Sequence, residues 1–252
     1  MQSSAKLEQT APSFCLYKLP PGVSKVDFDA QLNQFMDTMA QLPVVQENWA
    51  TFELILQNDK LDGCITDLGL PAPQQCAILI THAHSHEHCE KLTSHPSTQD
   101  MVAAATASGL FADACVFSAD LHTTVHIPEA DTRVHAFGVF KTHPEMSIPE
   151  LHAKLEELMD SIMENVPIAR ANLVQHSLWF QKTDAVSQHI RNIGFGDPKD
   201  DIFVVILETE TMEKLIEVIQ DETFQEALIE GLKDFPHLLE CSIFSADVFP
   251  KL

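Results

Sequence analysis

The chain has 252 residues, of which 45% are apolar and 21% are charged, and its formal net charge is −22. This size and composition are typical of a globular protein with one large domain or two small ones. The strong negative charge argues against nucleic acid and anionic membrane surfaces as partners, since both bind positive patches. No signal-peptide core and no apolar run of membrane-spanning length occurs in the sequence.

Six cysteines are scattered along the chain without a C-x-x-C pair, and no N-x-S/T sequon is present. A chain of this length does not need disulfides to fold, so we expect reduced thiols and a cytoplasmic location.

The first part of the chain alternates strand and helix patterns. The expected strands are 14–19, 49–57, 77–83 and 115–119. After the first strand, Leu32, Phe35, Met36 and Met39 repeat at helical spacing, and Pro43 ends that helix. A second helix is expected to begin at His86, with Ser85 as its N-cap.

The second part follows the same order. Its expected strands are 134–141, 173–181, 202–208 and 241–246, and the apolar positions of its first helix are Leu151, Leu155, Leu158, Met159 and Ile162. Thr211 is the expected N-cap of its second helix. Both parts therefore read β-α-β-β-α-β.

Aligned stretches indicate a duplication. "CVFSAD" from Cys115 and "CSIFSAD" from Cys241 share Phe-Ser-Ala-Asp, and "FCLYK" from Phe14 aligns with "FGVFK" from Phe137. The expected organisation is a flexible N-terminus (1–12), a first ferredoxin-like repeat (13–125), a linker (126–132) and a second ferredoxin-like repeat (133–252). The predicted fold class is α+β, a pseudo-dimeric α/β barrel in which the bare sheet faces of the two repeats pack together.

Asp120 and Asp247 end the expected closing strands identically. We interpret them as turn-forming or capping residues, with the alternative that one of them orients a histidine.

The most conspicuous motif is "ITHAHSHEHCEKL", in which His82, His84, His86 and His88 alternate with other residues. When the two repeats are aligned, His82 and His84 correspond to Glu208 and Glu210 of the second repeat. The histidines therefore extend from a strand end across a cap into a helix start. A solvated rim is the favoured interpretation. The alternatives are metal binding, through His82 with His84 or His84 with His88, and a role in a pocket.

His176 and His135 each lie in an apolar strand, and His176 aligns with Phe52 of the first repeat. Each is either a buried core residue or a general acid or base that faces a cavity. The two repeats differ in their histidines and aromatic residues, so we expect one functional pocket, in the second repeat.

The segments "LTSHPSTQDM" (92–101) and "VIQDETFQEA" (218–227) resemble the interrupted second helix of dimeric α/β-barrel proteins. That family includes antibiotic-biosynthesis monooxygenases, stress-responsive barrel proteins and olivetolic acid cyclase. The resemblance implies a barrel fold but leaves the activity open, because the fold hosts many chemistries.

The acid/base pair of olivetolic-type cyclases would fall on Thr98 and Leu92, or on Phe224 and Val218, and is therefore absent. A pocket histidine of those cyclases matches His135. No G-x-x-D-G signature and no proximal histidine for haem is found.

The leading hypothesis is a cofactor-independent tailoring enzyme that acts on an aromatic or polyketide-like small molecule by oxygenation, cyclisation or decarboxylation. No cofactor is expected, and the chain would be a monomer or a weak homodimer. The candidate catalytic residues are His176, His135 and His86, with His86 at the mouth of a first-repeat pocket. The candidate pocket residues are Phe137, Val139, Trp179, Phe180, Phe203, Tyr17 and Trp49.

Two alternatives remain open: a non-catalytic ligand-binding or stress-response barrel protein, and a metal-dependent enzyme that uses the histidines at 82–88. Walker, dinucleotide-binding, serine-hydrolase and H-E-x-x-H motifs are absent from the sequence.

Overall fold

Eight antiparallel strands close into one barrel in the computed structural model, which describes residues 11–111, 114–127, 133–142, 146–182, 187–188, 202–233 and 241–252. The strands are β1 (Ala11–Lys18), β2 (Trp49–Asn58), β3 (Cys76–Ala83), β4 (Cys115–His126), β5 (Val134–Lys141), β6 (Leu173–Lys182), β7 (Ile202–Thr209) and β8 (Ser242–Pro250). They are ordered β1-β3-β2-β8-β5-β7-β6-β4 around the barrel. The predicted α+β class is confirmed. The expected N-terminus and linker fall mostly on residues 1–10 and 128–132, which lie outside the described residues.

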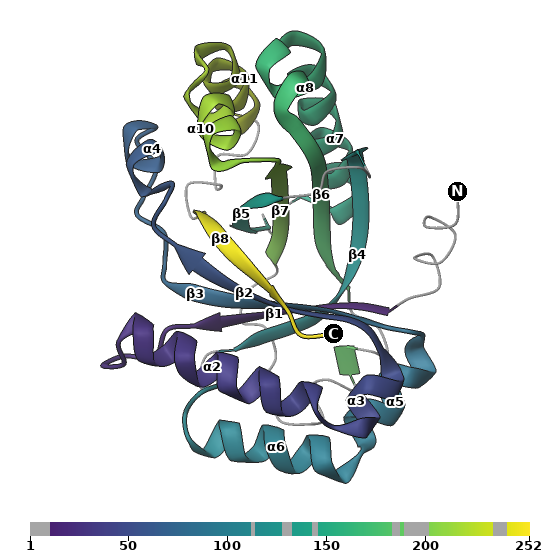
Figure 1. The fold of residues 1–252 in the computed structure, drawn as a ribbon. Coiled ribbons are helices and arrows are strands. Elements are labelled where there is room, and N and C mark those ends of the chain that lie inside the picture. Colours follow the sequence, from purple (N-terminus) through teal and green to yellow (C-terminus); the bar gives the residue numbers. More distant parts are fainter. Residues whose placement is uncertain are drawn as a thin grey trace.

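Helices cover the barrel on two opposite sides (Figure 1). The described helices are α2 (Lys25–Ala40), α3 (Pro43–Asn48), α4 (Asp62–Asp67), α5 (His86–Ser94), α6 (Pro96–Ala107), α7 (Ile148–Asn165), α8 (Pro167–Asn172), α10 (Met212–Gln220) and α11 (Glu222–Leu232). Figure 1 shows α2, α3, α5 and α6 on one side, and α7, α8, α10 and α11 on the other. The short helix α4 stands with the second group, next to α10.

Local sequence signals explain where the second helix of each part begins and where it is interrupted. Ser85 and Thr211 cap α5 and α10 as predicted, each accepting a hydrogen bond from a backbone N–H three residues on. His95 separates α5 from α6, and Asp221 separates α10 from α11; each caps the helix that follows it. These breaks coincide with the two segments that resemble the interrupted helix of α/β-barrel proteins.

The strands β4 and β8 continue several residues beyond their predicted ends, at 119 and 246. β4 extends to His126 and β8 to Pro250, so Asp120 and Asp247 lie inside strands, and their interpretation as turn or cap residues is wrong. The extended strands join the two parts of the barrel. Residues Ser118–His126 of β4 pair with β6, and residues Ser245–Pro250 of β8 pair with β2. In these positions Asp120 pairs with Lys182 at 2.9 Å and Asp247 with Lys60 at 2.8 Å.

The inside of the barrel is a packed core rather than a channel. All eight strands contribute alternate side chains to one apolar cluster. Its buried members are Phe14, Leu16, Ile55, Cys76, Ile78, Ile80, Phe117, Ala119, Phe137, Val139, Trp179, Ile202, Val204, Ile206, Phe244 and Ala246. The space that could hold a ligand therefore lies between the sheet and the helices.

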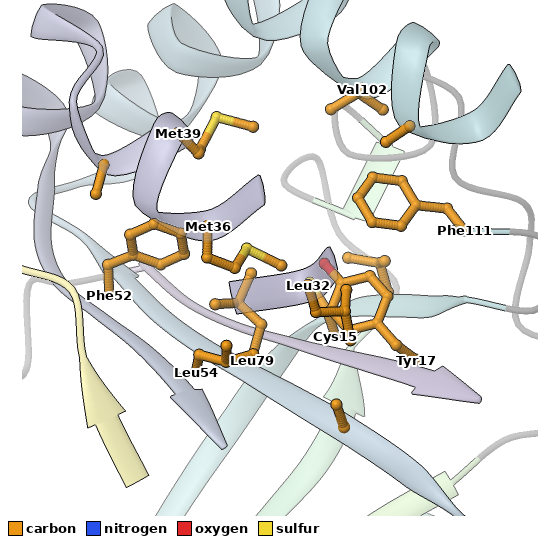
Figure 2. Close-up of a cluster of buried hydrophobic side chains, with 14 of the residues drawn as sticks. Cys15, Tyr17, Leu32, Met36, Met39, Phe52, Leu54, Leu79, Val102 and Phe111 are labelled. Atoms are coloured by element: carbon orange, nitrogen blue, oxygen red, sulfur yellow. The ribbon is translucent and has the colours of Figure 1, made fainter. Parts of the chain in front are cut away.

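The other face of each strand packs against the helices. Figure 2 shows part of the first such layer, where Met36 of α2 lies beside Phe52 of β2 and the ring of Tyr17 lies near that of Phe111. The ring centroids of Tyr17 and Phe111 are 5.1 Å apart. None of the six cysteines forms a disulfide, and no described helix is long and apolar enough to cross a membrane.

Candidate functional site

Two cavities lie between the barrel and its helices, one under each helix layer. The first has a volume of about 60 Å³ and lies against β1, β2, β3 and α2. The second has a volume of about 120 Å³ and lies against β5, β6, β7, α7 and α11. Ile65 of α4 and the adjacent Leu68 also line the second cavity, so the chain's first part supplies one of its walls.

The two cavities are built at equivalent positions of the chain. Tyr17, Met36 and Thr98 line the first, and the residues aligned with them, Phe140, Met159 and Phe224, line the second. The two sets differ mainly in polarity. The first cavity has cysteine, serine, threonine and tyrosine side chains in its wall, whereas the described residues that line the second are apolar apart from one imidazole.

That imidazole belongs to His176, near the middle of β6. Strand alternation points it to the helix side together with Leu178, while Trp179 points into the barrel. His176 is only 4% exposed. Burial lowers its pKa from 6.5 to about 4, so the ring is neutral at neutral pH. The second cavity thus combines an apolar space with one neutral group that can accept or donate a proton.

The first cavity is chemically different. Burial raises the pKa of the Cys15 thiol to about 12, an effect that a hydrogen bond with Tyr17 partly opposes. Burial also raises the pKa of Tyr17, so both groups stay protonated. The Oγ1 of Thr98 is buried there without a hydrogen-bond partner in the described part of the chain. This cavity offers hydrogen bonds but no basic group.

His135 lies elsewhere, at one end of the barrel interior. It stacks on Phe137 with ring centroids 6.1 Å apart, and its Nε2 is 3.7 Å from Glu208 Oε1. Arg133 and Gln175 donate hydrogen bonds to the same carboxylate at 2.7 and 3.0 Å. Burial lowers the pKa of His135, an effect that Glu208 opposes. The structure therefore does not bring His135 and His176 together in one cavity.

The histidines at 82–88 lie in different environments and do not form one cluster. His82 is buried and meets Trp179 edge to face at 5.7 Å, and burial lowers its pKa. His84 and His86 are exposed, and His88 Nδ1 is 2.7 Å from the hydroxyl oxygen of Ser85. His86 is not among the residues that line the first cavity, which begins one turn further along α5, at Cys89. The motif belongs to a strand end and a helix start, as the alignment indicated.

The predicted pocket residues divide among three places. Phe203 lines the second cavity, and Tyr17 and Trp49 line the first. Phe137 belongs to the barrel interior and also borders the second cavity. Val139 and Trp179 belong to the barrel interior, and Phe180 packs beside the second cavity against Phe203. These residues were predicted because most of them are aromatic, and an aromatic side chain can lie on either face of a strand between the barrel interior and the helices.

Comparison with solved structures places the fold among dimeric α/β-barrel proteins. An anthrone oxidase-like protein aligns over 96% of this chain and 94% of its own, with a TM-score of 0.57 and 9% sequence identity. A candidate monooxygenase from Fusobacterium nucleatum aligns over 94% and 92%, with a TM-score of 0.51 and 9% identity. The likeness is one of fold.

No protein-family model and no curated protein matches the sequence. The barrel type that the two short motifs indicated is confirmed by the structural comparison. A similarity of fold at 9% identity does not determine the reaction, which depends on the residues of this chain.

Proposed function

We propose that this protein is a cofactor-independent enzyme that acts on an aromatic or polyketide-like small molecule by proton transfer at His176. One observation carries the proposal: among the described residues that line the second cavity, His176 is the one titratable side chain, and the others are apolar. A dry pocket with a single acid/base group suits a substrate that supplies its own reactive enol or phenol. The anthrone oxidase-like and monooxygenase-like structural neighbours are consistent with oxidation as the reaction.

The low pKa of His176 defines what it can do. A neutral imidazole can take a proton from an acidic O–H or C–H group of a bound substrate. The products are an imidazolium and a substrate anion in contact, and their attraction in a dry cavity offsets the desolvation that lowers the pKa of His176. An enolate or phenolate formed in this way is electron-rich enough to react with dioxygen, or to add to a carbonyl group of the same molecule. Positioned proton transfer contributes about 10²–10⁴-fold in rate.

The size of the cavity bounds the substrate. Its volume of about 120 Å³ is close to that of an engineered apolar cavity, about 150 Å³, that binds benzene. The described arrangement therefore accommodates about one ring. A substrate with more rings would require α7 or α11 to move away from the sheet.

We also propose that the chain is a tandem duplication in which the two ferredoxin-like repeats form a pseudo-dimer. The strand order around the barrel is β4-β1-β3-β2 in one part and β8-β5-β7-β6 in the other, which is the same order twice. The cavities at aligned positions support this proposal. Divergence then left a histidine in the second cavity where the first has Phe52.

The test is turnover of phenols, enols and anthrone-type compounds in air, followed by oxygen uptake and product analysis. His176→Phe is the informative variant, because the aligned Phe52 shows that an aromatic ring fits at this strand position. We expect turnover to fall by about 10²–10⁴-fold in His176→Phe, with an unchanged circular dichroism spectrum. His86→Ala, at an exposed position outside both cavities, is the matched control and should keep its activity.

Unchanged turnover in His176→Phe would contradict the proposed mechanism. Ligand binding at this cavity without turnover of any compound would instead favour the alternative of a non-catalytic ligand-binding barrel protein.

A further inference from the structure

Three potential metal ligands meet outside both cavities, on the outer face of the barrel. They are His122 of β4 and His152 and Glu156 of α7, and one ligand atom from each lies within 4.8 Å of the other two. Among the residues that the structure describes, this is the one group of three histidine, cysteine or acidic side chains that satisfies this distance. It does not include any histidine of the 82–88 motif.

The backbone places these side chains in a geometry suited to a metal. His152 and Glu156 are four residues apart on a helix and so share one face of it. His152 Nε2 and Glu156 Oε1 are 3.5 Å apart, close to the ~3.4 Å edge of a tetrahedron with metal–ligand bonds of about 2.1 Å. His122 lies opposite Leu178 in the β4·β6 pairing and faces α7, with its ring centroid 4.0 Å from that of His152.

The surroundings leave a ligand atom unsatisfied. His152 Nε2 is buried and has no hydrogen-bond partner in the described residues. Phe180 covers one side, with its ring centroid 5.2 Å from that of His152 and 6.0 Å from that of His122. Asp120 Oδ2 is 3.6 Å from His122 Nε2, although Asp120 is also held by Lys182. All three ligand residues are partly exposed, so an ion can reach them from solvent.

We propose that His122, His152 and Glu156 bind a divalent transition-metal cation of the zinc class. Two imidazoles and one carboxylate are a ligand set that zinc and its neighbours in the first transition row accept. Three protein ligands leave one position for water.

The bound ion would join β4, from the first part of the chain, to α7, from the second. α7 also supplies Leu155, Leu158, Met159 and Ile162 to the wall of the second cavity. The ion would therefore hold that wall in place. This inference is independent of the proposed activity of His176.

The test uses the full-length protein without an affinity tag, stripped with a chelator and dialysed. Zinc chloride is then titrated by calorimetry, and thermal unfolding is followed with and without zinc. We expect one zinc ion per chain and a higher melting temperature with zinc. Because losing an outer-shell partner alone weakens a metal site by 10–100-fold, His152→Ala and Glu156→Gln should each weaken binding by at least about tenfold. Cobalt(II) should give visible absorption in the parent protein that is lost in His152→Ala.

The double variant His84→Ala/His88→Ala is the matched control, because it also removes two neighbouring histidines. The ring centroids of His84 and His88 are 5.5 Å apart. It should bind zinc as the parent does. Absence of stoichiometric binding would overturn the proposal. So would binding that survives both His152→Ala and Glu156→Gln but is lost in the control variant.

Discussion

At the scale of single residues, His176 combines burial with a titratable ring, and this has a cost in stability. Its pKa is about 4 in the folded protein and about 6.5 in an unfolded chain. The unfolded state therefore binds more protons between these values, and stability falls as the pH drops from about 6.5 toward about 4. The loss from this residue reaches about 3 kcal/mol at the acid end of the window.

His176→Phe should remove this contribution. We expect the variant to lose less stability than the parent between about pH 7 and about pH 4.5, as measured by urea unfolding at both values. His86→Ala changes an exposed histidine and should keep the parental pH dependence. An equal loss of stability in His176→Phe and in the parent would show that His176 is not a buried neutral ring.

His176 could be selected from the sequence because it interrupts an apolar strand and aligns with a phenylalanine. His135 also lies in an apolar strand, but it stacks on Phe137 and faces the barrel interior. Periodicity in β5 could not decide its side, because both faces of a strand between a barrel core and a helix layer are apolar.

At the scale of elements, local sequence signals located the strands and the longer helices, but not every strand end and not the short helices. Hydrophobic runs placed the strands, and Ser85 and Thr211 placed the second helix of each part. The short helices α3, α4 and α8 were not predicted. The extensions of β4 and β8 carry polar residues such as His122 and Thr123, and they are strand only because they pair with β6 and β2. His122 was consequently missed as a ligand, although the spacing of His152 and Glu156 was visible in the sequence.

Matched substitutions in the strands below the two cavities should have different effects on turnover and ligand binding. Val205 lines the second cavity and the aligned Leu79 lines the first. Val205→Phe should fill the second cavity and reduce turnover and ligand binding at least tenfold, whereas Leu79→Phe should leave both within about twofold. Each substitution adds volume to a packed layer and should cost about 1–3 kcal/mol, so urea unfolding must accompany the assays. Equal loss of activity in both variants would contradict the assignment to the second cavity.

At the scale of the whole molecule, both parts share one barrel interior, so they should unfold together. Phe244 is 1% exposed and stacks on Phe137 with centroids 5.8 Å apart. Phe244→Ala should cost about 3–5 kcal/mol while unfolding remains a single transition by circular dichroism and by tryptophan fluorescence. Phe249→Ala, at a position of the same strand that is 41% exposed, should change stability by less than about 0.5 kcal/mol. Two separate transitions in the parent would show that the parts are independent.

The proposed mechanism requires an aromatic ligand to bind in the second cavity against His176. The decisive experiment is a crystal structure of the protein with a bound phenol. We expect the phenol ring to lie between β6 and α7, with its oxygen about 2.6–3.2 Å from an imidazole nitrogen of His176. A phenol bound only in the first cavity, with the second cavity empty, would contradict it.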